Sequence, residues 1–179
     1  MRATPLTVAA LAAALLLTAC DDGGSEDNSK DSKDSAAGSA CRIGEMAVRV
    51  GPANAAPAAG DTGNVPVTLT NRSGAECTLD GLPAVEFSAG GTSTTVAPDE
   101  AAEAKKTTLV KEASTSLTLT YVRGGKGGSK SLAVDTAKIY LPGSTEPHSF
   151  PWSYGVVALK SGGGQAPDAS VSGFQQSGD

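Results

Sequence analysis

The chain has 179 residues, enough for one ordinary domain with additional segments, and a net charge of -5 at pH 7. It has no basic stripe and only 4% aromatic residues, so it does not offer the stacking and cationic surfaces of proteins that bind nucleic acid. Four of the net negative charges lie in residues 21–40, which leaves the rest of the exported chain close to neutral.

Residues 1–19 have the layout of a secretory signal peptide that is cleaved. Arg2 precedes an apolar run over residues 6–17, and small residues follow. The run is shorter than the roughly 20 apolar residues that span a bilayer, and Asp21 and Asp22 come soon after it. We therefore expect no permanent transmembrane helix.

The end of this leader reads Leu17, Thr18, Ala19, Cys20, which resembles a lipobox. In a lipobox the cysteine sulfur forms a thioether with a diacylglyceryl group, and two acyl chains anchor a protein stably where one does not. The alternative is an ordinary signal peptide followed by an incidental cysteine. We predict lipidation at Cys20, with the membrane as a partner through this anchor and the protein on the outer face of the cell membrane.

Two further cysteines, Cys41 and Cys77, remain as an even pair in an exported, oxidising compartment. We predict a disulfide between them, with two free thiols as the alternative. Closing a loop of about 37 residues stabilises a fold by about 3.8 kcal/mol in the chain-entropy model. The single histidine, His148, is remote in sequence and nothing resembles a ligand cluster, so we expect no metal and no cofactor.

Residues 20–40 are expected to form a lipidated cysteine followed by a disordered acidic, Ser/Gly-rich tether. This stretch has almost no apolar side chains to offset the entropy of ordering it. Its root-mean-square reach is about 25 Å. A tether of this length either lets the domain reach into the cell wall or acts as a generic spacer. The domain itself is expected over residues 41–175, with a disordered tail at 176–179.

The domain consists of short β-prone runs separated by Gly, Pro, Asn and Asp. Alternating apolar residues predict strands over residues 65–70 and 117–122. Pro66 indicates an edge position or a strand start, and Gly90-Gly91 indicates a hairpin turn. Further strands are expected at residues 46–50, 77–79, 85–88, 92–96, 132–141 and 170–174.

One stretch departs from this pattern. Residues 99–106 are rich in Glu, Ala and Lys and predict a short helix capped by Asp99. Seven or eight short strands with almost no helical periodicity predict an all-β fold, an immunoglobulin-like β-sandwich with one disulfide.

A resemblance supports this architecture. Cys41 opens the domain, an apolar strand ends in Asn71-Arg72-Ser73-Gly74, and Cys77, Leu79, Gly81 and Pro83 follow as Cys-x-Leu-x-Gly-x-Pro. This pattern resembles an uncharacterised immunoglobulin-like domain of unknown function found in secreted lipoproteins of high-GC Gram-positive (actinobacterial, streptomycete-type) bacteria. Where such domains often have a Pro-Gly turn before the Leu-x-Leu strand, this chain has Lys111-Glu112-Ala113. The resemblance implies fold and compartment, and no activity.

No catalytic constellation is recognisable. A Ser-His-Asp triad has only His148 as a base, in a segment that resembles a loop, and no Gly-x-Ser-x-Gly elbow occurs. The glycine-rich loop over residues 124–130 lacks phosphate-loop spacing. Four carboxylates are candidates by type, but nothing selects a pair: Glu86, Asp99, Glu100 and Glu103.

The densest aromatic cluster contains Phe150, Trp152 and Tyr154. These rings either form a recognition patch for sugar or protein or cover one end of the core. Asn71 matches a glycosylation sequon, and in a bacterial lipoprotein we expect it to supply a turn instead.

These features favour a non-enzymatic binding or interaction module, monomeric and lipid-anchored, with an envelope protein or a wall polymer as partner and no nucleic acid. The competing hypotheses are an envelope enzyme or enzyme accessory with an unrecognised carboxylate site, and a passive envelope component. All three share one architecture, so fold alone does not decide between them.

Overall fold

The computed structural model describes residues 38–162 and 164–176. The predicted leader (1–19), Cys20, the tether as far as residue 37 and the tail residues 177–179 lie outside this described part. The described residues form β-strands and one 3-10 turn, η1 (Ile43–Glu45), with no α-helix among them. None of these residues belongs to a helix of the length and apolar character that a bilayer crossing requires.

The strands are β1 (Met46–Val50), β2 (Thr62–Asn71), β3 (Cys77–Gly81), β4 (Ala84–Ala89), β5 (Thr92–Pro98), β6 (Lys105–Leu109), β7 (Ser114–Val122), β8 (Ser131–Leu132), β9 (Thr136–Tyr140), β10 (Pro147–Pro151), β11 (Val157–Ala158), β12 (Ala169–Val171) and β13 (Gln175–Gln176).

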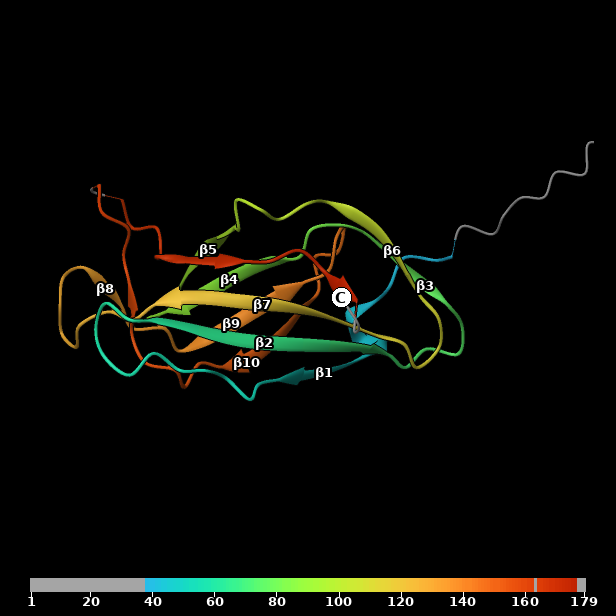
Figure 1. The fold of residues 1–179 in the computed structure, drawn as a ribbon, viewed down its shortest axis with the longest axis horizontal. Helices are drawn as coiled ribbons and strands as arrows, with labels where there is room; N and C mark the ends of the chain where they lie inside the picture. The colour runs from blue at the N-terminus through green and yellow to red at the C-terminus, as the bar shows by residue number, and fades with distance from the viewer. Residues whose placement is uncertain (1–37, 163, 177–179) are drawn as a thin grey trace, which may run out of the picture. The chain divides into compact units, whose positions relative to one another are not determined.

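Eight strands form one barrel-like sheet in the order β1-β2-β7-β12-β5-β4-β9-β10, and β13 adds to β7. The all-β prediction is therefore confirmed. Every pairing is antiparallel except β12 with β5, where Ser170 lies opposite Ala97. Figure 1 shows β2 and β7 in front of β4 and β9, with the core between them. The sheet is mixed and curls through β12 rather than separating into two sheets.

The core is built by the two strands whose alternation the sequence shows most clearly. In β2 and β7, every second side chain is fully buried, among them Val65, Val67, Leu117 and Leu119. Each such side chain contributes about 1.5 to 3 kcal/mol through burial. Both predicted strands are confirmed, and they pair with each other along most of their length.

The predicted hairpin turn is also confirmed. Gly90 and Gly91 join β4 to β5 with φ angles of 54° and 83°. Two successive positive φ values are typical of a type I′ turn, whose backbone matches the twist of the two flanking strands. Glycine adopts these φ values without a steric penalty.

Three local predictions were wrong. Residues 99–106 form a turn and the start of β6 instead of a helix, although Asp99 Oδ1 accepts a hydrogen bond from the Ala101 N–H as a cap would. Residues 132–141 belong to two strands instead of one. Leu132 ends β8, which pairs with β11, and the chain then forms β9, which pairs with β4. Pro66 lies inside β2, a central strand, and not at an edge or a strand start. The pairing of β1 with β2 ends at the residue after it, Val67, and the Pro66 carbonyl oxygen accepts a hydrogen bond from the Gly51 N–H.

Two small strand pairs extend the fold at its ends. β3 pairs with β6, and β8 pairs with β11. Figure 1 places β3 and β6 at one end of the sheet and β8 at the other. The two ends therefore differ in the loops that they carry.

Candidate functional site

The predicted disulfide joins Cys41 and Cys77, and both side chains are buried. The Cys41 N–H donates to the carbonyl oxygen of Thr78, and the Thr78 N–H donates to that of Ser39. Residues 39–41 thus run alongside β3. The described chain enters the domain at the β3 and β6 end.

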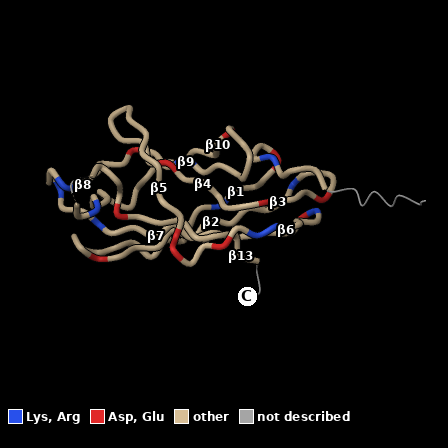
Figure 2. The backbone as a smooth tube through the Cα atoms, turned by 90° about the horizontal axis from the view of Figure 1, so that it is seen from above, with Lys and Arg blue, Asp and Glu red and all other residues tan. Residues whose placement is uncertain are grey.

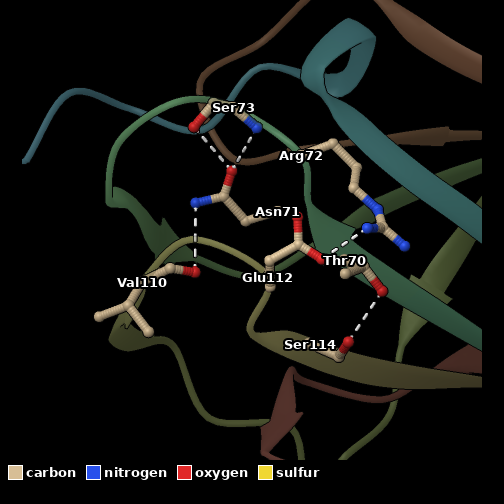
Figure 3. Close-up of polar contacts among 7 residues, drawn as sticks. All are labelled: Thr70, Asn71, Arg72, Ser73, Val110, Glu112 and Ser114. Carbon is tan, nitrogen blue, oxygen red and sulfur yellow. Dashed lines mark hydrogen bonds and ion pairs between the residues drawn. The ribbon is translucent and has the colours of Figure 1, made fainter.

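Asn71 organises the turns at this same end. Its side chain is fully buried, and its Nδ2 donates to the carbonyl oxygens of Ala75 and Leu109, each at 2.9 Å. Its Oδ1 accepts from both the N–H and the hydroxyl of Ser73. Figure 3 shows the amide between Ser73 and Val110. Because the nitrogen of the sequon is enclosed and bonded, this asparagine supplies a turn rather than a glycosylation site.

The neighbouring turn contains a strained residue. Glu112 has a φ of 66° and is the single non-glycine residue of the described chain with a positive φ. Its N–H donates to the Asn71 carbonyl oxygen, and its carboxylate forms an exposed ion pair of 2.6 Å with Arg72. The backbone at position 112 therefore has a conformation that favours glycine.

The Cys-x-Leu-x-Gly-x-Pro block is structural as well. Leu79 is 1% exposed, Pro83 is buried, and Gly81 has a φ of 123° beside Pro142. These residues shape the strand pair and its exit.

The aromatic cluster packs beneath the opposite end. Phe150 and Trp152 are buried, and Tyr154 is partly exposed. The indole of Trp152 lies 4.8 Å from the ring of Phe87, 5.1 Å from that of Tyr121 and 4.9 Å from that of Tyr154. Its Nε1 donates to the Gly155 carbonyl oxygen at 2.7 Å. The indole is therefore enclosed by other rings instead of presenting a flat face to solvent.

Tyr121 ties two loops to this cluster. Its hydroxyl accepts from the Ala56 N–H at 3.2 Å and donates to the Tyr154 carbonyl oxygen at 2.9 Å. A Cβ on Gly63 would lie 2.5 Å from the Tyr121 ring, so only glycine fits opposite it. The end of β7 is thereby fixed against residues 51–61 and 152–156.

Arg123, which sequence analysis did not single out, follows directly after β7. Its Nη1 donates to the carbonyl oxygens of Ala56 at 2.6 Å and Pro57 at 3.3 Å. Its backbone N–H donates to Asp61 and its carbonyl oxygen accepts from Gly60. Within residues 38–162 and 164–176, no carboxylate lies within ion-pair distance of this guanidinium. The partners are backbone carbonyls distant in sequence, which carry no side-chain signature.

A depression of about 330 Å³ opens beside Arg123. The guanidinium lies over Gly155, where a Cβ would come within 3.2 to 3.4 Å of its Nε, Cζ and Nη2 atoms. The polar and aromatic lining residues are Arg123, Lys126, Asp135, Trp152 and Ser153.

Lys126 is exposed and lines this depression, and two further exposed lysines, Lys130 and Lys160, lie on neighbouring loops. The Lys130 carbonyl oxygen accepts from the Leu159 N–H at 2.9 Å, which places Lys130 and Lys160 on paired segments. We call Arg123 and these lysines the basic end. Figure 2 shows blue positions gathered around β8.

Three carboxylates share the loops of this end. Asp61 accepts from the Ala58 N–H and Asp135 accepts from the Gly90 N–H, so both carboxylates are partly engaged by backbone. Asp168 lines a separate depression of about 260 Å³ together with Lys160. None of the three forms an ion pair with the basic end in the described part of the chain.

Of the four carboxylates considered for glycoside cleavage, Glu86 lines a different depression from Asp99, Glu100 and Glu103. Glu86 lines a depression of about 350 Å³ on the outer face of β4 and β9, where its Oε2 accepts from the Tyr140 hydroxyl at 2.9 Å. This hydrogen bond raises the pKa of Tyr140, helped by desolvation and by the charge of Glu86. Asp99 and Glu103 line a different depression, and Glu103 pairs with Lys105 at 3.1 Å.

His148 lies on β10 opposite Ile139, in a segment that the sequence indicated as loop. Partial burial lowers its pKa. The described residues contain no group of three or more His, Cys, Asp or Glu side chains arranged to hold a metal ion.

Comparison with known proteins adds one match. A family model described as Domain of unknown function (DUF4232) matches residues 41–175. No curated protein matches the chain.

Proposed function

We propose that this chain, which belongs to the DUF4232 family of domains of unknown function, is a non-enzymatic binding module held on the outer face of the cell membrane by lipid on Cys20. Its partner is an envelope component, either a protein or a wall polymer. The barrel-like sheet is, in this proposal, a variant of the immunoglobulin-like sandwich of secreted lipoproteins from high-GC Gram-positive bacteria, with β12 joining the two layers.

The observation that carries the proposal is the separation between the entry of the chain and the basic end. Residues 39–41 run beside β3, at one end of the sheet. Arg123 pairs with Val157 of β11, which pairs with β8, and Figure 1 places β8 at the other end. Figure 2 shows the blue Lys and Arg positions gathered there. A tether that enters at residue 41 would leave the basic end on the side of the domain away from its point of attachment.

The basic end also has the build of a recognition surface. Arg123 is held by backbone carbonyls rather than by a carboxylate, so its charge stays available to a ligand. The loops around it are fixed by the Tyr121 hydroxyl and by the Trp152 indole. A preformed surface loses less conformational entropy on binding than a loose one.

The test is photocrosslinking in the native cells. A photoreactive amino acid replaces Lys126 at the basic end or, as a control, Lys111 in the exposed turn after β6. We expect a specific adduct from position 126 and none from position 111. The Cys20→Ser form should lose membrane attachment and yield much less adduct.

Equal adducts from both positions would point to nonspecific encounters and overturn the proposal. An absence of adducts at position 126 would favour the passive envelope component. A Cys20→Ser protein that stays membrane-bound would overturn the anchor.

A further inference from the structure

The donors left free on Arg123 define what the depression can hold. Nη1 is occupied by the carbonyl oxygens of Ala56 and Pro57, while the structure gives Nε and Nη2 no acceptor in the described chain. These two nitrogens form one edge of the planar guanidinium, which binds two oxygens of an oxyanion side by side. A Cβ at position 155 would lie 3.2 to 3.4 Å from Nε, Cζ and Nη2, so glycine there avoids a tight contact with this part of the group.

A second cation lines the same depression. Lys126 lines the depression from a glycine-rich loop that is closed by a hydrogen bond from the Gly128 N–H to the Gly125 carbonyl oxygen. Gly127 has a φ of 70°, and such turns direct successive N–H groups toward anions. Arg123 and Lys126 thus give the lining of the depression two positive charges.

The lining of the depression also supplies hydrogen-bonding groups of another kind. Asp135 uses Oδ2 to accept from Gly90, which leaves Oδ1 as an acceptor, and Ser153 contributes an exposed hydroxyl. A carboxylate oxygen accepts from a hydroxyl group and repels an anion. The depression therefore combines two cationic groups with an acceptor for hydroxyl groups.

We infer that the depression binds a phosphate group in a polymer whose repeating units also carry hydroxyl groups, namely a polyol phosphate or sugar phosphate. Arg123 and Lys126 hold the phosphate, and Asp135 accepts from a neighbouring hydroxyl. Lys130 and Lys160 lie along the loops that flank the site and meet further phosphates of the same chain. This inference rests on the proposed function and specifies its ligand.

Calorimetric titration of the full chain carrying Cys20→Ser with synthetic poly(glycerol phosphate) tests the inference. Polygalacturonate, which has hydroxyl groups and carboxylates, is the matched anionic control, and dextran is the neutral control. We expect binding to poly(glycerol phosphate), about tenfold weaker binding to polygalacturonate, and none to dextran. The affinity should fall as the salt concentration rises.

Substitutions locate the site. Arg123→Gln should weaken binding about tenfold, because a charge-assisted hydrogen-bonding edge is lost. Since this change also removes contacts to residues 56 and 57, Lys126→Ala provides an independent probe on an exposed loop, with an expected loss of about threefold and an unchanged Tm. Lys126→Ala/Lys130→Ala should weaken binding, whereas Lys106→Ala/Lys111→Ala, with the same charge change at the other end, should not.

Equal affinity for both anionic polymers, or equal losses in the two double variants, would reduce the effect to general charge attraction and overturn the inference. Failure to bind poly(glycerol phosphate) would overturn it as well. A specific protein adduct from position 126 in cells would in that case leave the proposed function standing.

Discussion

The side-chain amide of Asn71 donates a 2.9 Å hydrogen bond to the carbonyl oxygen of Leu109, so the end of β2 is bonded to the end of β6 through a buried side chain. These two strands belong to different sheets. The bond fastens the β3 and β6 pair to the main sheet at the end where the chain enters.

Asn71→Ala should destabilise the domain by about 2 to 3 kcal/mol, because the carbonyl oxygens of Leu109 and Ala75 lose their buried donor. Urea unfolding would measure the change. Arg72→Ala is the control, since its ion pair with Glu112 is more than half exposed and should contribute at most about 1 kcal/mol. An Asn71→Ala variant as stable as Arg72→Ala would contradict this account of Asn71.

The disulfide gives a second prediction. Cys41→Ser/Cys77→Ser should lose about 3.8 kcal/mol of unfolding free energy, because the unfolded chain regains the entropy of a loop whose ends are 36 residues apart. Reduction of the wild-type protein should lower its Tm to a similar degree. If neither treatment changed Tm, the disulfide would have no part in stability.

The contact between Gly63 and Tyr121 gives a third. Gly63→Ala places a methyl group within 2.5 to 2.8 Å of the Tyr121 side chain and should cost about 1 to 3 kcal/mol. Gly74→Ala is the matched control, because no atom lies within 4 Å of its Cβ position. Thermal unfolding of the two variants compares them directly, and equal Tm values would show that the Tyr121 ring moves aside freely.

Glu112 provides a test of backbone strain. Glycine at position 112 should be about 1 kcal/mol more stable than alanine there, since both remove the ion pair and only glycine accepts a φ of 66° at no cost. At Lys111, which has no positive φ, the order of glycine and alanine should reverse. Denaturant unfolding of the four variants measures both differences, and the same order at both positions would exclude strain at Glu112.

The pair formed by Tyr140 and Glu86 predicts a pH dependence. Because the hydrogen bond to Glu86 raises the pKa of Tyr140 above 10, the folded protein holds the phenol proton more tightly than the unfolded chain. The resulting stabilisation is fully present below pH 10 and is lost as pH rises through the folded pKa.

An NMR titration of the Tyr140 ring should therefore give a midpoint above 10 in the wild type and a lower one in Glu86→Gln. A midpoint unaffected by Glu86→Gln would assign the shift to burial alone.

The sequence was sufficient to predict those elements that depend on residues close together in the chain or on residue type alone. Alternating burial specified β2 and β7, the two glycines specified the β4–β5 hairpin, and an even pair of cysteines specified the disulfide. Strand β6 was missed because it forms only a short pair with β3, and most of its side chains are exposed and polar. Strand β10 was missed because a proline stands at each end of it, which also suits a strand at the edge of a sheet.

The candidate site was less accessible to sequence analysis for a related reason. Arg123 gains its position from carbonyl oxygens of residues 56 and 57, and any residue type supplies a carbonyl. The aromatic residues 150, 152 and 154 were visible in the sequence, but whether they face the core depends on the distant rings of Phe87 and Tyr121.

The position of β12 has a consequence for the order in which the chain is made. β12 lies between β5 and β7 in the sheet, and it is synthesised after both of them because it follows them in the chain. Until residue 171 has emerged, β5 and β7 each keep an unpaired edge, and such edges invite pairing with other chains. A product truncated before Ala169 should therefore be prone to aggregation and proteolysis even though every earlier strand is present.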